Sequence, residues 1–344
     1  MRTITIYPYN PTLEFLIKYI GEIQQYEKIF LVADSIGKIL KKEDGRFEFV
    51  CDWREGIRYC DELLLVEGLG SKETYSQVVQ YAMTEKKKIK AVKSVWNILD
   101  LKMKESVDCF GRNNITLPEN EVLHEIDVPV ISVMSLGEYA GKFRVQLAMK
   151  KFFEEAGYKV ILYGSSELSN LFGLELYPDF MIEEHSMKEK ILSMNHCIYK
   201  TVQREKPDLV ILGCLGGIMP FNRYAHNFFG EIPLVLSKAV PIDINFIISH
   251  FLGENEDETY FEQLDLFCKE NFGCENNFFT ISNTSMNYNR EKKQMEYMIL
   301  DKEMVKNEIR KIKYDKLFDS MSKANLIKVF QGMKEMLEAD YQVL

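Results

Sequence analysis

Residues 128–164 read VPVISVMSLGEYAGKFRVQLAMKKFFEEAGYKVILYG, and this stretch decides the fold of the chain. The apolar run at 128–134 is short and rich in β-branched residues, which is typical of a buried strand. After a loop that ends at Gly141-Lys142, apolar residues recur at helical spacing, and a second buried strand is expected at 160–163. The stretch therefore predicts a βαβ unit with a turn at the carboxyl end of its first strand.

The turn has the composition of a phosphate-binding loop. Free N–H groups at the start of a helix favour an anion, and a lysine there adds a mobile positive charge. The common pattern G-x-x-x-x-G-K-[ST] is not met, because Leu136 takes the first glycine position and Phe143 takes the hydroxyl position. A Gly-Lys pair that falls by chance between a strand and a helix is the alternative interpretation.

The loop resembles that of the dethiobiotin synthetase-like branch of P-loop proteins, which has one more residue before the Gly-Lys pair. On that template Ser135 replaces the first glycine, and Gly137, Gly141 and Lys142 fill the loop. The resemblance implies a site for the phosphate groups of ATP or acetyl-CoA. We expect Lys142 to be solvated when this site is empty.

Three further segments are expected to contribute to the same site. Their candidate binding residues are Arg144, Gly164, Ser165, Gly216 and Gly217. Arg144 either supplies charge in place of a metal ion or lies on the solvated face of the helix. The glycines follow predicted strands, where they allow a backbone to approach a ligand or another strand closely.

Two positions that bind metal in the relatives are changed here. The relatives carry a hydroxyl residue after the lysine and an acid before the Gly-Gly turn, where this chain has Phe143 and Gly213. Phosphoryl transfer depends on a metal ion that bridges the phosphates and neutralises their charge. We therefore expect no metal site, weak dependence on Mg²⁺ and hydrolysis at background, unless Glu138 or Asp243 holds the metal instead. No set of catalytic residues can be assigned from the sequence.

The chain length of 344 residues predicts two domains. Alternating strands and helices predict a Rossmann-like α/β domain over residues 1–118 and a degenerate P-loop NTPase-like α/β domain, with C-terminal helices, over residues 125–344. Predicted strands of the first domain end at Asp34 and Glu67, which either meet a ligand or cap the following helices. In the second domain, the apolar run at 232–240 predicts a further strand.

Composition argues against several classes of protein. The net charge is -9, and the only basic tract is at 86–88, so nucleic acid is not an expected partner. The sequence has no apolar run long enough to cross a membrane and opens directly on a strand, which predicts a cytoplasmic protein. The seven cysteines include no C-x-x-C pair, and we expect most of them to be buried, reduced thiols.

The order of the predicted strands, helices and loops resembles that of the D-glutamate N-acetyltransferase-like proteins, which join a Rossmann-like domain to a dethiobiotin synthetase-like P-loop domain. The opening IYPYNPTLEFLIKY at 6–19 is similar to that of a clostridial protein family encoded beside radical-enzyme and carrier-protein genes in peptide-maturation clusters.

Two functions follow from these resemblances. The first is a non-hydrolysing accessory or partner protein in the maturation of a ribosomal peptide such as a bacteriocin. It implies a peptide substrate or maturation enzymes as partners, and it allows a homo-oligomer. The second is an ATP- or acyl-CoA-dependent transferase that acts on a peptide or an amino acid. An intact Mg²⁺ site would favour ATP-dependent chemistry, whereas its loss favours the accessory role or acyl transfer.

Overall fold

The chain forms two compact α/β units. The computed structural model describes residues 2–33, 45–68, 71–111, 113–115, 118, 120–224, 226–253 and 256–341. The first unit comprises Met1–Asn113 and Glu167–Leu176, and the second comprises Asn114–Ser166 and Tyr177–Leu344. The return of Glu167–Leu176 to the first unit has no signal in the sequence pattern.

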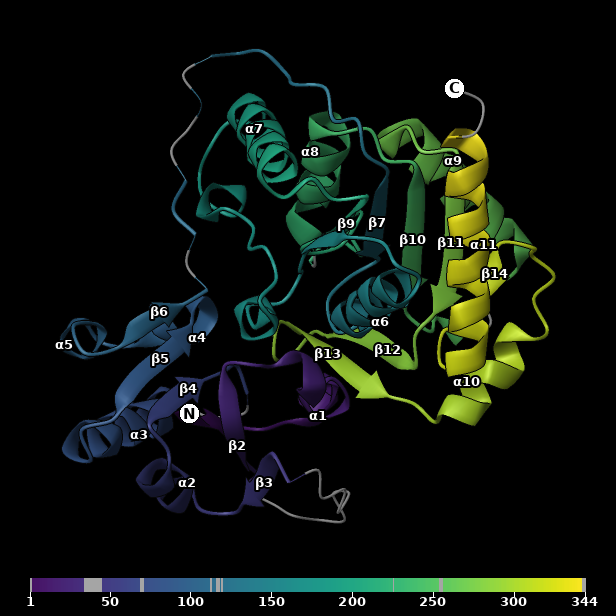
Figure 1. Cartoon of the computed structure of the whole chain (residues 1–344). Helices are drawn as coiled ribbons and strands as arrows, with labels where there is room; N and C mark the ends of the chain where they lie inside the picture. Colours follow the sequence, from purple (N-terminus) through teal and green to yellow (C-terminus); the bar gives the residue numbers. More distant parts are fainter. Residues whose placement is uncertain are drawn as a thin grey trace. The chain divides into compact units, whose positions relative to one another are not determined.

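The first unit contains a six-stranded parallel sheet in the order β3-β2-β1-β4-β5-β6 (Figure 1). This is the strand order of Rossmann folds. Its strands are β1 (Arg2–Tyr7), β2 (Tyr26–Val32), β3 (Phe47–Val50), β4 (Glu62–Leu65), β5 (Lys88–Val92) and β6 (Asp108–Phe110). Its helices are α1 (Glu14–Lys18), α2 (Trp53–Tyr59), α3 (Lys72–Thr84), α4 (Lys93–Ile98) and α5 (Leu101–Lys104). Every residue of β4 is buried, as expected for a central parallel strand covered on both faces.

Two acids of this unit were expected to end strands and either to meet a ligand or to cap the following helix. Asp34 lies outside the described residues. Glu67 follows β4, but the cap of the next helix is Ser71, whose side chain accepts a hydrogen bond from the backbone N–H of Thr74. The capping alternative for Glu67 is therefore wrong, because the chain continues past it before α3 begins.

The second unit contains another six-stranded parallel sheet, in the order β14-β11-β10-β7-β9-β8. Its strands are β7 (Val130–Ser135), β8 (Val160–Tyr163), β9 (Leu209–Gly213), β10 (Ile244–Ser249), β11 (Asn276–Ile281) and β14 (Leu317–Phe318). A separate antiparallel hairpin consists of β12 (Thr284–Asn289) and β13 (Gln294–Ile299). The helices are α6 (Lys142–Glu155), α7 (Met187–Glu205), α8 (Glu231–Ala239), α9 (Glu258–Phe272), α10 (Lys302–Ile309) and α11 (Lys323–Tyr341).

Helices cover both faces of this second sheet. Helices α7, α8 and α9 pack on one face, where their apolar side chains join those of the sheet in one core (Figure 1). Helices α6 and α11 lie together on the other face, where the ring of Phe330 packs 5.7 Å from that of Phe152 and 6.3 Å from that of Phe246. The fold class predicted from the sequence, a Rossmann-like unit followed by a P-loop-like unit, is confirmed.

Residues 128–164 fold as predicted, with β7, a loop, α6 and β8 in succession. Because β7 lies between β9 and β10, the carboxyl ends of these three strands meet beside the loop. The prediction of a strand at 232–240 is wrong, since this run forms α8. A short apolar run fits a buried helix as well as a buried strand, and Pro233 is tolerated because it lies in the first turn, where its missing N–H would have no partner within the helix.

Five of the seven cysteines are buried, as expected for structural thiols. Within the described residues, no helix is both long and apolar enough to cross a membrane.

The packing of α11 generates a stability prediction. Phe330 is 1% exposed, so Phe330→Ala should lower the free energy of unfolding of the second unit by ~3–5 kcal/mol, since it leaves a cavity in the core. The matched control is Ile327→Ala on the same helix, whose side chain is 43% exposed and should cost less than about 1 kcal/mol. Urea titration followed by circular dichroism measures both changes. Equal losses would show that α11 is not docked as described.

Candidate functional site

The site is built around the buried ammonium group of Lys142, the first residue of α6. Its Nζ donates to Ser135 Oγ at 2.9 Å, to the carbonyl oxygen of Gly137 at 3.2 Å and to that of Gly216 at 2.6 Å. These oxygens come from the end of β7, from the loop and from the segment after β9. The lysine therefore joins three separate parts of the chain at one point.

This geometry corrects one expectation. Lys142 was expected to be solvated in the empty loop, but its side chain is only 6% exposed. Each of its three N–H bonds has an oxygen partner, so burying the charge is compensated by hydrogen bonds. The loop thus holds its own lysine in the position from which the ammonium group could meet an anion.

The backbone of the loop and of the neighbouring glycines is adapted to close packing. Gly141 precedes α6 with φ +77°, and Gly216 has φ +69°, conformations that favour glycine. A Cβ on Gly217 would lie 2.3 Å from the carbonyl oxygen of Leu136 and 2.6 Å from Asn227 Nδ2. The same Asn227 amide donates to the carbonyl oxygens of Leu136 and Met219, at 2.8 and 2.9 Å, and so ties the loop to the segment after β9.

The space beside Gly213 is filled by a glutamine. A Cβ on Gly213 would lie 2.4–2.5 Å from the amide atoms of Gln146, which is fully buried. Gln146 Nε2 donates to Ser165 Oγ at 2.8 Å, and Gln146 Oε1 accepts from the backbone N–H of Ser165 at 3.0 Å. The amide therefore occupies the place where an acid at position 213 would begin, and it links Ser165 to α6. Gly164, next to Ser165, is buried.

The residues that follow Lys142 differ in their surroundings. Phe143 is buried, so an aromatic ring occupies the position of the expected hydroxyl. Arg144 is half-buried, and its Nε lies 4.0 Å from the point where a Cβ on Gly141 would be. The guanidinium therefore folds back toward the start of the helix. This position fits the expectation that Arg144 contributes charge to the site better than the expectation of a solvated helix face.

A histidine that the sequence analysis did not select completes the site. His250 follows β10 and is fully buried. Its Nε2–H donates to the carbonyl oxygen of Glu138 at 2.7 Å, which leaves Nδ1 as an acceptor, and Nδ1 has no hydrogen-bond partner among the described residues. Burial lowers the pKa of His250 to about 4, so the ring is neutral at pH 7.

The hairpin of β12 and β13 packs against this loop. The ring of Tyr297 lies 4.6 Å from that of Tyr139 and 6.0 Å from that of His250. Met286 Sδ lies 3.6 Å from the point where a Cβ on Gly137 would be. The hairpin therefore limits access of water to the loop and to His250.

The structure brings the predicted residues together around one centre. We call the Lys142 ammonium group and its three oxygen partners, from Ser135, Gly137 and Gly216, the lysine cage. Gly141 directly precedes Lys142, and Gly217 follows Gly216. Ser165 contacts Gln146 of α6, and Arg144 lies near Gly141. Sequence reasoning missed Gln146, Asn227 and His250. Gln146 lies one helical turn after Lys142, and His250 ends a predicted strand, which are the two signals that could have found them. Among the described residues, no group of three or more His, Cys, Asp or Glu side chains is placed to hold a metal ion.

The lysine cage predicts that Lys142 supports the fold. Lys142→Ala should lower the free energy of unfolding by ~2–4 kcal/mol, because it removes the donor to Ser135 Oγ and to the carbonyl oxygen of Gly216. Lys150→Ala on the same helix removes a partly exposed pair with Glu154 and should cost less than about 1 kcal/mol. Urea titration of both variants is the measurement. A loss at Lys142 no larger than that at Lys150 would contradict the buried cage.

The buried histidine predicts a pH dependence. Between pH 6.5 and about 4 the unfolded chain takes up a proton on His250 that the folded protein excludes, so acidification through this range should lower stability. His250→Gln keeps a donor for Glu138 but does not titrate. The free energy of unfolding of the wild type should fall relative to this variant by up to ~3 kcal/mol from pH 6.5 to 4.

His250→Gln is needed as a reference because the titration of Glu256 changes the stability of the protein with pH in the opposite direction. Burial raises the pKa of Glu256 to about 7, so its contribution to stability is present below pH 4.5 and is lost as the pH rises to about 7. Both proteins retain Glu256, and its effect cancels in the comparison. Parallel pH curves for the wild type and His250→Gln would show that His250 is not held neutral.

Comparison with known proteins supports the fold alone. No family model matches the chain, and no curated protein matches it. A crystal structure of a DUF1611 family protein from Anabaena variabilis is similar, with a TM-score of 0.57 and 10% sequence identity, over 96% of this chain and 100% of that chain. A pseudomurein peptide ligase type C from Methanothermus fervidus has a TM-score of 0.30 at 10% identity, over 81% of this chain and 48% of its own. A similarity with so low a TM-score supports no conclusion about this chain. The chain thus shares its two-unit α/β fold with a DUF1611 family protein.

Proposed function

We propose that the second unit binds the phosphate groups of a nucleotide or of coenzyme A without a metal ion and without hydrolysing them. We further propose that the chain serves as an accessory or partner protein in the maturation of a ribosomal peptide. The proposed phosphate-binding residues are those of the lysine cage and its neighbours: Ser135, Gly137, Gly141, Lys142, Arg144, Gly164, Ser165, Gly216 and Gly217.

The observation that carries this proposal is the position of Lys142. Its ammonium group lies at the N-terminus of a fourteen-residue helix, in a loop that follows a central strand of a parallel sheet. An entering phosphate would meet the positive end of the helix and could replace carbonyl oxygens as partner of the ammonium group. Arg144, which folds back toward Gly141, would supply a second positive charge.

Absence of hydrolysis follows from what fills the metal positions. A buried ring stands at position 143, and the Gln146 amide fills the space at Gly213. Neither group can replace the hydroxyl and the acid that hold Mg²⁺ in active P-loop enzymes. Without an ion that neutralises the developing charge, transfer of the terminal phosphate has no electrostatic assistance beyond the lysine and the arginine.

The peptide-maturation role rests on the opening of the chain. The stretch at 6–19 is similar to the start of a protein family encoded in peptide-maturation clusters. In the structure its first tyrosine, Tyr7, ends β1, is buried and packs against Tyr75 with ring centroids 6.2 Å apart. This part of the stretch therefore supports the sheet, and contact with a partner would involve other residues.

Acyl transfer from a coenzyme A thioester to a peptide or amino acid is the second candidate. It is favoured by His250, whose ring is neutral and whose Nδ1 has no partner among the described residues. With its pKa held near 4 by burial the imidazole is a weak base, and it would accept a proton from an attacking amine only after contact with water restores its pKa toward 6.5. Movement of the β12–β13 hairpin would be needed to expose it.

The proposal predicts binding that does not depend on Mg²⁺. Titration calorimetry with ADP, ATP and coenzyme A should give the same dissociation constant, within about twofold, with Mg²⁺ and with EDTA. At least one ligand should bind at least about tenfold more weakly to Lys142→Met, at a temperature where that variant is folded, while Lys150→Met binds as the wild type does. Phosphate release from ATP should stay at background.

Two results would contradict the proposal. One is rapid ATP turnover that requires Mg²⁺, which would mean that Glu138, Asp243 or another acid holds the metal. The other is tight ligand binding that Lys142→Met leaves unchanged, which would place the ligand elsewhere. Acyl transfer is tested separately by release of the free coenzyme A thiol from acetyl-CoA in the presence of the peptide.

A further inference from the structure

A cavity of about 430 Å³ lies in the C-terminal part of the second unit, away from the elements that form the lysine cage. Helix α10, strand β14 and helix α11 supply its walls. Its floor is apolar and includes Ile309, Leu317 and Phe318. Strand β14 is the last strand of the sheet on this side, so the cavity lies at a sheet edge.

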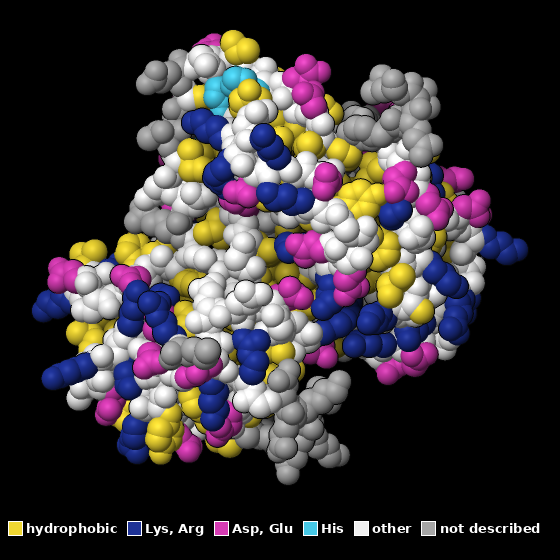
Figure 2. All heavy atoms as spheres, in the orientation of Figure 1, with side chains coloured by type: hydrophobic (Ala, Val, Ile, Leu, Met, Phe, Trp, Pro, Cys, Tyr) yellow, Lys and Arg dark blue, Asp and Glu magenta, His cyan; other side chains and the backbone are white. Residues whose placement is uncertain are grey.

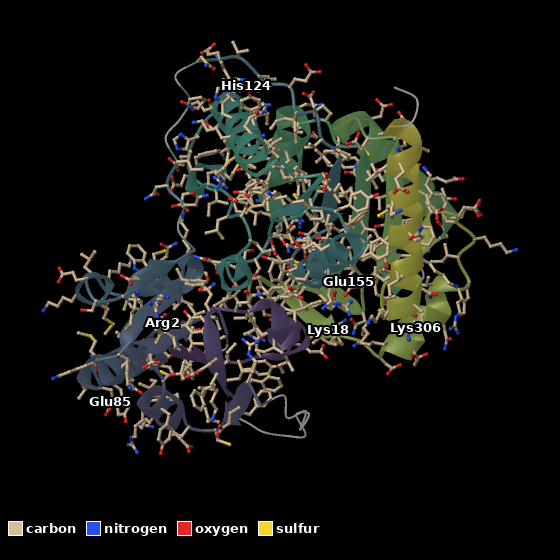
Figure 3. All side chains as sticks on the ribbon, in the orientation of Figure 1. Arg2, Lys18, Glu85, His124, Glu155 and Lys306 are labelled. Carbon is tan, nitrogen blue, oxygen red and sulfur yellow. The ribbon has the colours of Figure 1, made fainter. Side chains whose placement is uncertain are left out.

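The rim of the cavity is positively charged. Lys306, Arg310 and Lys328 line it, together with a single acid, Asp319. Lys306 is labelled on α10 in Figure 3. We call this cavity with its three cations the basic groove.

The three cations are only partly neutralised. Lys306 pairs with the exposed carboxylate of Glu303 at 2.7 Å. Arg310 donates to the neutral amide oxygen of Asn307 at 3.3 Å, and Lys328 makes no ion pair or hydrogen bond within the described part of the chain. The charges of Arg310 and Lys328 are therefore available to a partner.

The acid on the rim already has partners. Asp319 Oδ1 accepts hydrogen bonds from the backbone N–H groups of Met321 and Ser322, at 2.8 and 3.3 Å. Its carboxylate thus organises the turn before α11. Within the described part of the chain it forms no ion pair with the three cations, although, after the hydrogen bond with Glu303, its negative charge helps to raise the pKa of Lys306.

The charge of this region is opposite to that of the whole chain. The three cations and one acid that line the cavity give its rim a net charge of +2, in a chain whose net charge is -9, while residues 301–341 as a whole carry nine Lys or Arg and eight Asp or Glu. Figure 2 shows Lys and Arg side chains gathered on the right of the view, where α10 and α11 lie in Figure 1. Positive charge concentrated around an apolar cavity favours an anionic partner with an apolar part.

We propose that the basic groove binds an acidic peptide segment, with an apolar side chain in the cavity and carboxylates beside Lys306, Arg310 and Lys328. The cations come from α10 and its C-cap on one side and from α11 on the other, which suits a partner with charges at more than one point. A peptide presents charges at several points with apolar groups between them.

The proposal is independent of the lysine cage, because no residue of the basic groove belongs to the proposed phosphate site. A peptide that binds here would give the accessory role a physical basis. Failure of phosphate binding would leave this inference unaffected, and failure of peptide binding would leave the phosphate site unaffected.

The experiment uses the full chain and fluorescence anisotropy. The probe is a short labelled peptide of alternating glutamate and leucine residues, compared with a peptide in which glutamine replaces every glutamate. The acidic peptide should bind at least about tenfold more tightly than the neutral one, and its affinity should fall as salt rises from about 50 to about 300 mM.

Paired variants locate the binding. Arg310→Gln combined with Lys328→Gln should weaken binding of the acidic peptide about tenfold. Lys200→Gln combined with Lys238→Gln removes two exposed lysines from α7 and α8 and should leave it unchanged. Circular dichroism confirms that each protein is folded, since all four side chains are on the surface.

Three outcomes would overturn the inference. The first is equal affinity for the acidic and neutral peptides. The second is an equal loss, or no loss, in the two double variants. The third is stronger binding to phosphatidylserine vesicles than to the acidic peptide, with the loss in Arg310→Gln/Lys328→Gln confined to the vesicles, which would identify an anionic lipid surface as the partner.

Discussion

The buried ammonium group of Lys142 is the interaction on which the second unit depends. A lysine removed from water needs oxygen partners for its N–H bonds, and here they come from the end of β7, from the loop after it and from the segment after β9. These hydrogen bonds tie the loop after β7 to the segment after β9, in which Gly216 has a positive φ. The same group that stabilises the empty loop is the one best placed to meet a phosphate, so stability and ligand binding compete for one charge.

The surroundings of this lysine explain why the loop is adapted to binding more than to phosphoryl transfer. Gln146 fills the space beside Gly213 and uses its amide to hold Ser165, while Phe143 packs into the core. These are well-packed and hydrogen-bonded contacts, so the altered positions are part of a stable arrangement. His250 differs from them. Its Nδ1, which has no partner among the described residues, is a cost to the fold, and buried polar atoms that lack a partner tend to persist where they have a function.

How far the sequence predicts this structure depends on whether the signal is local. The change from a short β-branched apolar run to helical spacing across residues 128–155 is local, and it correctly placed β7, the loop and α6. The residues of the lysine cage were found because a Gly-Lys pair before a helix has a direct physical meaning. The run at 232–240 was misassigned because nine mostly apolar residues suit a buried helix and a buried strand equally. Gln146 and His250 were missed because their roles depend on which strands are neighbours, and the sequence does not state the order of the strands in the sheet.

The central claim is that the ammonium group of Lys142 meets the phosphate of a ligand without a metal ion. The most direct test is nuclear magnetic resonance of lysine side chains labelled with ¹⁵N at Nζ, with the Lys142 signal assigned by its absence in Lys142→Met. We expect this signal to shift and saturate as ADP or coenzyme A is added in the presence of EDTA. A ligand that binds while the Lys142 signal stays unchanged, or that shifts it only when Mg²⁺ is present, would show that this ammonium group does not bind the phosphate on its own.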